Sequence, residues 1–525
     1  MEGIKMAHSF ICDPNTAVVE TTKGKVHGYV YDGVHMFKGI PYAKAKRFQA
    51  PEPMDAWDGI LETTNYGFVC PLLDFESKPM GELAVPHRFW VMNEDCLNLN
   101  IWTPACDDQK RPVMVWLHGG GFEAGSAIEQ IAYEGENMSR LGDVVVVSIN
   151  HRLNILGYFD MSAFGEKYAN SGNAGTDDII AALHWIHDNI ESFGGDKDNV
   201  VVFGQSGGGL KITTLLQTPA ADGLFAKGIV MSGVMDAAVA DQKGSGEELV
   251  KAVMSELNIS TAEELEEVPY AQFAAAYKKI RPALQAEGKY VGGAPHPNAY
   301  YAGEPITNGF RKETASIPLM VGSVIGEFAS FAPNRYDRAN LSAEEGWDEV
   351  KKVMGQDAVT ELKPMFEAAY PERSPVDLFT LDFMIRIPEQ QYIKMRSELN
   401  TCTYSYLFNL DMPMEGGKTP WHCVDIPFFF HNTELVPVSQ VEGVTERLEE
   451  EIFESVIAFA RTGNPSNAKL DSWKECTAAE EHTMVFGASS GVRTNFDHKL
   501  IPALAKYMGP VFERMMQAAS GNIQH

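Results

Sequence analysis

The sequence predicts an α/β fold built on a mixed, mostly parallel central sheet with antiparallel strands at its N-terminal side. Three observations predict it. The first sixty residues contain short β-rich pieces separated by glycines, and from residue 112 onward nearly continuous apolar runs alternate with long helical segments. Two further stretches have helical composition and no strand pattern. Runs that are apolar at every position are typical of parallel strands buried on both faces.

The N-terminal pieces favour an antiparallel meander. Asp32 and Gly33 form an Asp-Gly dipeptide between two β-rich pieces, which is typical of a tight hairpin turn. The three predicted strands are residues 17–20, 25–31 and 34–38.

The parallel part of the sheet is predicted from five apolar runs. Between two of them, residues 177–190 place Ile179, Leu183, Ile186 and Ile190 on one face of a helix. Such a helix can connect two parallel strands and cover the sheet. The five runs are residues 113–117, 144–149, 200–203, 229–231 and 319–324.

Two stretches rich in Ala, Glu and Lys, residues 236–318 and 344–400, are predicted to be helical insertions that cover one end of the sheet. No Pro/Gly/Ser-rich linker separates them from the rest, so we expect a single domain over residues 1–525, although an independent insertion domain remains the alternative. A long helix is expected around residues 446–462, followed by a short amphipathic segment at the C-terminus.

Charge and composition exclude several classes of protein. The chain of 525 residues has 43 Lys and Arg against 71 Asp and Glu, a net charge of −28, which would repel a phosphate backbone; no nucleic-acid partner is expected. The longest apolar runs fall far short of the ~20 residues of a membrane-spanning helix, so no membrane partner is expected. The N-terminal residues lack the apolar core of a signal peptide, which predicts a cytoplasmic protein, or a secreted one if a leader has been removed.

We expect no metal and no organic cofactor. The seven cysteines form no CxxC pair, and no HExxH helix occurs. His184 and His187 lie three residues apart in the predicted helix and are interpreted as ordinary helix residues.

The strongest functional signal is the pentapeptide of residues 204–208, Gly-Gln-Ser-Gly-Gly, which follows an apolar strand and precedes a helix-compatible segment. This is the G-x-S-x-G pattern in the strand–turn–helix context of a nucleophile elbow. The sharp turn strains Ser206, and glycines at positions 204 and 208 avoid collisions across it. The sequence therefore predicts Ser206 as a nucleophile at a helix N-terminus, where the helix dipole favours developing negative charge.

A second signal follows the predicted strand of residues 113–117. His118 is followed by three glycines, whose backbone N–H groups are exposed without side chains in the way. Such a loop is suited to bind the oxyanion formed during acyl transfer. His118 is tempting as a general base, but we expect it to support the shape of this loop instead.

In combination, these motifs resemble those of type-B carboxylesterases, the carboxylesterase/cholinesterase family of α/β-hydrolase fold. The similarity covers nearly the whole chain. The matching segments are FKGIPYA at 37–43, EDCLNLNIWTP at 94–104, HGGGF at 118–122, NHR at 150–152, GNAG at 172–175, the elbow at 204–208 and ARTGNP at 460–465.

The resemblance implies the remaining site residues. It implies Glu327, after the strand of residues 319–324, as the triad acid, and His422, in the HCVDIPFFF loop, as the base. It implies that Ser232 supports the acid and that the N–H groups of Gly120, Gly121 and Gly207 are the oxyanion donors.

The resemblance also implies structural ion pairs between Arg47 and Glu94 and between Arg152 and Asp178. It aligns Cys70 and Cys96 with the first disulfide of the family. Here we expect the two thiols to be reduced but close in space.

The predicted function is that of a serine carboxylesterase, in EC class 3.1.1, which cleaves short or medium acyl esters of small molecules through an acyl-enzyme. The same triad could act on amide, carbamate or thioester bonds, and a non-catalytic family scaffold is the remaining alternative.

The sequence departs from the family pattern at the elbow, where Gln205 and Gly207 replace the Glu and Ala of the usual G-E-S-A-G. In addition, no tryptophan stands at the choline-stacking position, so a cholinesterase is not expected. Both a monomer and a homodimer fit the sequence. The candidate aromatic residues of the substrate gorge are Phe122, Tyr300, Tyr301, Phe328 and Phe331.

Overall fold

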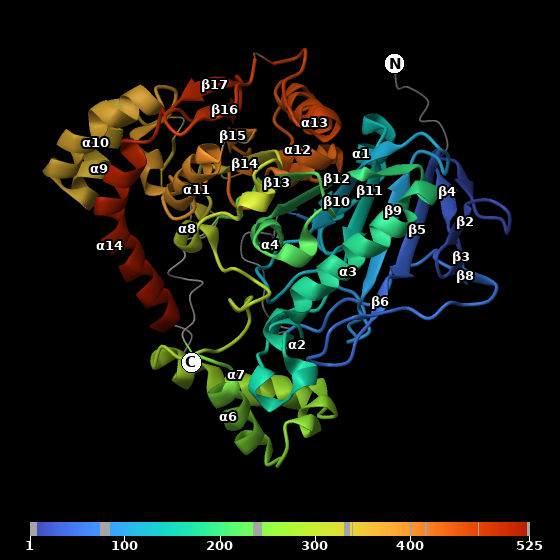
Figure 1. Ribbon diagram of the computed structural model, residues 1–525. Helices are drawn as coiled ribbons and strands as arrows, with labels where there is room; N and C mark the ends of the chain where they lie inside the picture. Colours follow the sequence, from blue (N-terminus) through green and yellow to red (C-terminus); the bar gives the residue numbers. More distant parts are fainter. Residues whose placement is uncertain are drawn as a thin grey trace.

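A twelve-stranded sheet organises the computed structural model, in the order β1-β4-β5-β9-β11-β10-β12-β13-β14-β15-β16-β17 (Figure 1). The structure describes residues 8–73, 85–234, 244–329, 336–338, 340–399, 402–414, 417–470 and 472–521, with side chains through residue 511. Neighbouring strands from β11 to β16 are parallel, while those from β1 to β11 and the final pair β16–β17 are antiparallel. The predicted mixed, mostly parallel sheet is confirmed.

The strands of this sheet are short, and the central ones are buried along most of their length. They are β1 (Phe10–Ile11), β4 (Tyr29–Tyr31), β5 (Val34–Pro41), β9 (Asn98–Thr103), β10 (Arg111–Leu117), β11 (Val145–Ile149), β12 (Gly195–Gln205), β13 (Lys227–Met231), β14 (Leu319–Val324), β15 (Thr403–Phe408), β16 (His482–Phe486) and β17 (Gly491–Thr494). All five predicted apolar runs are strands of the parallel part.

The N-terminal meander is only partly as predicted. The hairpin at Asp32 and Gly33 joins β4 to β5, and both turn residues have positive φ, 45° and 83°. The predicted strand of residues 25–31 is wrong as one unit, because it is divided at Gly28 between two sheets. A Cβ on Gly28 would lie 2.1 Å from the Met36 carbonyl oxygen, so only glycine allows the chain to cross there. One of the two small sheets contains β2 (Val18–Thr21), β3 (Gly24–His27) and β8 (Ile60–Glu62). The other contains β6 (Ala43–Lys44) and β7 (Glu52–Pro53).

Helices cover both faces of the sheet. The predicted helix of residues 177–190 is α3, and the C-terminal helix α14 is longer than expected, although side chains are described only for its first half. The α-helices of the described residues are α1 (Glu136–Gly142), α2 (Asn154–Gly157), α3 (Ala174–Asn189), α4 (Gly207–Leu216), α6 (Glu247–Leu257), α7 (Tyr270–Ala286), α8 (Pro305–Asn308), α9 (Ala343–Met354), α10 (Gln356–Ala369), α11 (Arg386–Glu398), α12 (Ile426–Phe430), α13 (Thr445–Thr462) and α14 (Leu500–Gly521).

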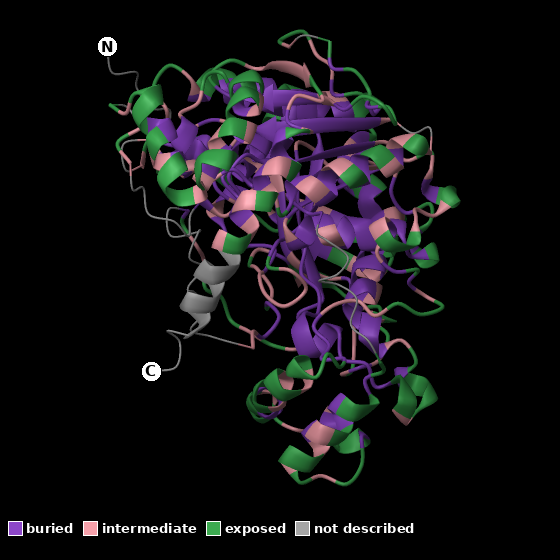
Figure 2. Ribbon diagram, turned by 90° about the vertical axis from the view of Figure 1, so that its left-hand side faces the viewer, coloured by how far each residue is buried: buried purple, intermediate pink, exposed green. Residues whose placement is uncertain are grey.

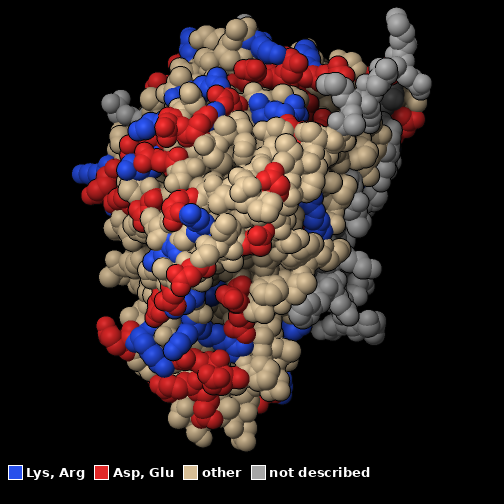
Figure 3. All heavy atoms as spheres, turned by 90° about the vertical axis from the view of Figure 1, so that its right-hand side faces the viewer, with Lys and Arg blue, Asp and Glu red and all other residues tan. Residues whose placement is uncertain are grey.

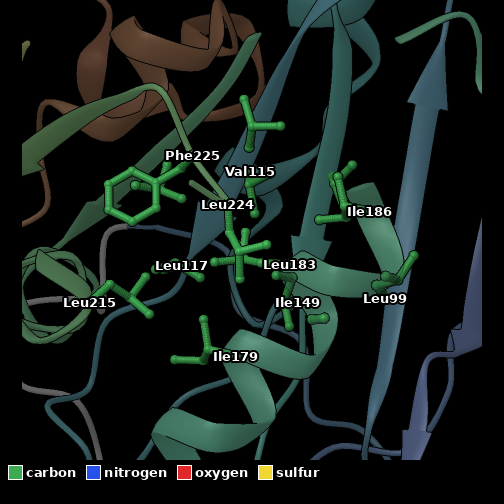
Figure 4. Packing of buried hydrophobic residues seen from close by; sticks show 14 of the residues in the cluster. Leu99, Val115, Leu117, Ile149, Ile179, Leu183, Ile186, Leu215, Leu224 and Phe225 are labelled. Carbon is green, nitrogen blue, oxygen red and sulfur yellow. The ribbon is translucent and has the colours of Figure 1, made fainter. Parts of the chain in front are cut away.

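Alternation along β10 divides the core into two layers. Val115 and Leu117 point to the layer that contains α3 and α4, whereas Met114 and Trp116 point to the layer that contains α12 and α13. Figure 4 shows the first layer, in which Leu183 of α3 and Leu215 of α4 lie among residues of β9, β10 and β11. The sheet is therefore buried on both faces, as its apolar runs require.

The described parts of the two predicted insertions contain α6 to α8 and α9 to α11. Helices α6 and α7 of the first insertion form a lobe at the bottom of the molecule. Figure 2 shows this lobe below the main core, with exposed outer surfaces and a small buried centre. Leu249, Val253 and Phe273 of this lobe belong to an apolar cluster that also includes Phe48 and Phe159, so the lobe packs against segments outside the insertion. Residues 236–243 and 400 of the predicted insertions lie outside the described residues.

The surface carries mixed charge. On the face in Figure 3, acidic and basic side chains are interspersed, without a field of one sign. Within the described ranges, every helix is too short or too polar to cross a lipid bilayer. The same ranges contain no cluster of three or more His, Cys, Asp or Glu suited to a metal ion, and His184 is exposed on α3.

Candidate active site

Ser206 occupies the junction between β12 and α4 in a strained backbone conformation, with φ 56° and ψ −121°. Its backbone N–H donates to the Met231 carbonyl oxygen at 2.8 Å, which fixes the turn to the neighbouring strand. A Cβ on Gly204 would lie 2.5 Å from the Leu117 carbonyl oxygen, and one on Gly208 only 1.9 Å from it. The two glycines are thus required by close backbone approach, as the sequence predicts.

Glu327 and His422 lie together although 95 residues separate them. Glu327 follows β14 and is fully buried, and its Oε2 lies 2.5 Å from Nδ1 of His422. Its Oε1 accepts the backbone N–H of Val324 at 2.9 Å. The backbone N–H of His422 donates to the backbone carbonyl oxygen of Glu327 at 3.0 Å. A carboxylate held at Nδ1 leaves Nε2 as the nitrogen that can accept a proton.

A neutral amide lies against the same imidazole. Nε2 of Gln205 is 3.3 Å from Nδ1 and 3.2 Å from Nε2 of His422, and Oε1 of Gln205 accepts the Cys423 thiol at 3.1 Å. Sequence reasoning assigned no contact to Gln205, since its partner Cys423 stands 218 positions away.

The three predicted oxyanion donors come from two segments that touch. Gly120 and Gly121 have positive φ, 85° and 63°, in the loop after β10. Gly207 is the first residue of α4, and a Cβ on it would lie 2.2 Å from the Gly121 carbonyl oxygen and 2.4 Å from the Gly121 nitrogen. The glycine in place of the usual alanine therefore allows the loop to lie directly on the helix N-terminus. Peptide N–H groups near a helix N-terminus are suited to stabilise an anion.

A cavity of about 360 Å³ opens beside Gly120 and Gly121. Its lining is largely apolar and comes from the oxyanion loop, α4, residues 293–304 and α11. Phe122 and Tyr301 line it as expected; Tyr300 and Phe328 are not among its lining residues, and Phe331 lies outside the described residues. Size and lining fit a small apolar ligand group.

Ser232 does not make the predicted contact with the acid. Its backbone has φ 45° and its N–H donates to the Gly322 carbonyl oxygen at 2.6 Å, while its buried hydroxyl has no hydrogen-bond partner among the described residues. The supporting role of Ser232 stays a prediction.

Three further buried carboxyl groups surround Glu327. Burial, together with the charge of Glu327, raises the pKa of Asp382 to about 7 and that of Asp425 to about 7. Burial raises the pKa of Glu389 to about 8. Asp382 accepts three backbone N–H groups of the following turn, and Asp425 accepts the Tyr406 hydroxyl at 3.0 Å. Asp425 stands within the His422 motif, which was the one sequence signal for this cluster.

His118 is placed beneath the oxyanion loop, where its buried ring stacks on His151 with centroids 5.1 Å apart. Burial first, and then the charge of Lys211, hold the pKa of both rings well below the usual range. Nδ1 of His118 contacts the Gly119 carbonyl oxygen at 2.9 Å. These contacts are those of a residue that supports the loop, in line with its sequence interpretation.

The implied architectural pairs are present. Arg47 contacts Glu94, and Arg152 binds Asp178 through Nη2 at 2.6 Å and Nε at 2.8 Å. Cys70 and Cys96 are both buried free thiols.

Comparisons with known proteins agree with this geometry. The model of the family described as "Carboxylesterase family" matches residues 15–500. The para-nitrobenzyl esterase of Bacillus subtilis (strain 168) is 32% identical over 465 residues, which cover 86% of this chain and 91% of that one. The phenmedipham hydrolase of Pseudarthrobacter oxydans is 28% identical, over 90% of this chain and 95% of that one. A solved esterase from anaerobic Clostridium hathewayi, described as able to hydrolyze aliphatic aromatic polyesters, is 48% identical with a TM-score of 0.93, covering 95% of this chain and 100% of that one.

Proposed function

The chain belongs to the carboxylesterase family and is a carboxylic ester hydrolase of the serine type, and we propose that Ser206, His422 and Glu327 are its catalytic triad. The observation that carries this proposal is the 2.5 Å contact between Glu327 Oε2 and His422 Nδ1 next to the strained Ser206. No other buried acid–histidine pair of the described residues stands beside a serine at a strand–helix turn.

The proposed mechanism follows from the position of each group. His422 Nε2 accepts the Ser206 proton while the oxygen attacks the ester carbonyl, and Glu327 stabilises the resulting imidazolium. The N–H groups of Gly120, Gly121 and Gly207 bind the oxyanion. His422 then gives the proton to the departing alcohol oxygen, an acyl-enzyme remains, and water repeats the two steps to release the acid.

The cavity beside the oxyanion loop supports an assignment to the acyl side of the substrate. The departing alcohol must lie at His422, because that residue protonates it. The cavity is lined by Gly120 and Gly121 but by no described residue of the segment 409–425 that contains His422. The acyl group is the part of the ester that remains for this space.

We propose esters with short, medium or aromatic acyl groups as substrates. An apolar cavity of about 360 Å³ is at the small end of ligand sites, about 300–1,000 Å³. The polyester-hydrolysing relative from Clostridium hathewayi supports aromatic acyl groups as part of this range. The free, buried Cys70 and Cys96 support action in a reducing compartment such as the cytoplasm.

The test is a series of p-nitrophenyl esters from acetate to dodecanoate, with benzoate and an aliphatic–aromatic polyester, together with a matched p-nitroanilide. We expect kcat/KM to rise to a medium chain, to remain high for benzoate and to fall for the longest chains, while Ser206→Ala abolishes turnover. Turnover of the anilide at the rate of the ester would favour the amidase alternative. Wild-type rates in Ser206→Ala would refute the triad.

A further inference from the structure

A lysine lies in the core directly behind the oxyanion loop. Lys211 is on α4, five residues after Ser206, and its side chain is 1% exposed. Its Nζ donates a hydrogen bond to the His118 carbonyl oxygen at 2.8 Å. The neighbouring residues of the helix, Ile212 and Leu215, are fully apolar and buried in the same layer.

The stability of the fold does not explain a lysine at this position. Burial lowers the pKa of Lys211 to about 7, and only the charge of Glu129 acts in the opposite direction. No carboxylate of the described residues lies within ion-pair distance of Nζ. A buried ammonium with one neutral acceptor is costly, and an apolar side chain of similar volume would be the more stable choice. Such departures from local rules cluster at functional sites.

The hydrogen-bond acceptor shows what the lysine can do. His118 is the first residue of the loop whose Gly120 and Gly121 are the proposed oxyanion donors. α4 already touches this loop through Gly207, which packs on Gly121, and through Gly208, which packs on the carbonyl of Leu117. Lys211 adds a directional bond one turn further along the same helix. The loop is thus held by the helix that begins at the nucleophile.

We propose that Lys211 is a positioning residue that fixes the oxyanion loop on α4 through the His118 carbonyl. It acts through the loop and contacts no substrate. The inference rests on the proposed role of Gly120, Gly121 and Gly207 as oxyanion donors. Its consequence is specific: loss of Lys211 weakens binding of the tetrahedral intermediate more than binding of the substrate.

The experiment compares Lys211→Met with Lys227→Met. Lys227 of β13 is a half-buried lysine that contacts Asn199, outside the site, so it controls for the general effect of replacing a partly buried lysine. For each protein we would measure kcat and KM for p-nitrophenyl butyrate, the inhibition constant of a trifluoromethyl ketone and the melting temperature. Rates are normalised to active sites titrated to completion with a fluorophosphonate. The ketone reports on the oxyanion loop, because Ser206 adds to its carbonyl carbon and the oxygen becomes an oxyanion.

We expect Lys211→Met to lower kcat and to weaken the ketone by the same factor, about 10- to 100-fold, which is less than the loss of a whole donor, with KM within about threefold. Lys227→Met should leave both values unchanged. Values of kcat and ketone affinity within about twofold of wild type would overturn the inference, whatever the melting temperature. If Lys211→Met does not fold, Lys211→Gln is judged by the same criteria. A wild-type enzyme that the ketone does not inhibit would instead refute the proposed oxyanion hole itself.

Discussion

The side-chain amide nitrogen of Gln205 lies 3.2 Å from Nε2 of His422, the ring nitrogen that we propose accepts the proton of Ser206. The amide is oriented from its other end, where Oε1 accepts the Cys423 thiol at 3.1 Å. Gln205 is fully buried, so this arrangement is part of the core beneath the site. A neutral group therefore stands where related elbows carry a glutamate.

Gln205→Glu should raise the pKa of His422, because a nearby negative charge favours the imidazolium. The base would then stay protonated to higher pH, so we expect the acidic limb of the kcat/KM profile to move upward by about one pH unit. The measurement is a pH–rate profile with p-nitrophenyl acetate. Gln205→Met, which removes the amide without adding charge, should leave the limb in place, and an unmoved limb in Gln205→Glu would show that the 205 side chain does not act on the base.

Glu327→Gln should lower kcat by about 10³- to 10⁴-fold while the protein stays folded, because an amide cannot hold the Nδ1–H tautomer or stabilise the imidazolium. The hydrogen bond from Val324 to Oε1 can persist in the variant. Burst kinetics with a p-nitrophenyl ester and a circular dichroism melting curve separate loss of catalysis from loss of fold. A variant with kcat within tenfold of wild type would identify a different orienting group for His422.

The parts of the site that local sequence determines could be predicted. Ser206 and the glycine loop stand directly after strands, where only glycines permit the observed backbone contacts, and the resemblance to the family led to Glu327 and His422. Contacts between distant segments could not be read from the sequence. The hydrogen-bond partner of Gln205, Cys423, stands 218 positions away. From sequence alone, Lys211 would be assigned to the solvent-facing side of its helix, whereas in the structure it bonds the first residue of the oxyanion loop.

The fold shows the same limit. Apolar runs predicted the five parallel strands, since burial on both faces requires apolar residues at every position. The split of the predicted strand 25–31 depends on the approach of the Met36 backbone to Gly28, which no local pattern contains. The hydroxyl of Ser232 has no hydrogen-bond partner among the described residues, and the local sequence gives no sign of this.

Gly207→Ala should impair catalysis although alanine is the usual residue of such elbows. The new Cβ would meet the backbone of Gly121 at 2.2 to 2.5 Å, a contact that only a shift of the oxyanion loop can relieve. We expect kcat to fall by about 10-fold or more with little change in KM, as for a weakened oxyanion donor. Gly491→Ala is the matched control, since a Cβ there meets nothing within 4 Å. If Gly207→Ala keeps wild-type kcat, the loop adapts to the side chain and the close packing is not needed for activity.

Asp425→Asn should change how stability depends on pH. The folded-state pKa of Asp425 is raised from 3.8 to about 7, so the folded protein binds a proton there that the unfolded chain releases at lower pH. This contribution to stability is present below about pH 4 and is lost as the pH rises to about 7. Asparagine resembles the neutral carboxyl group and can still accept the Tyr406 hydroxyl. The variant should therefore gain stability relative to wild type as the pH rises from about 4 to about 7, with a constant difference above that range.

Urea unfolding at about pH 4.5, 6 and 8 measures this difference in unfolding free energy. The exposed Asp58→Asn is the control for removal of a surface charge. A difference in unfolding free energy that is the same at all three pH values would mean that Asp425 is ionised in the folded protein, in spite of its burial beside Glu327.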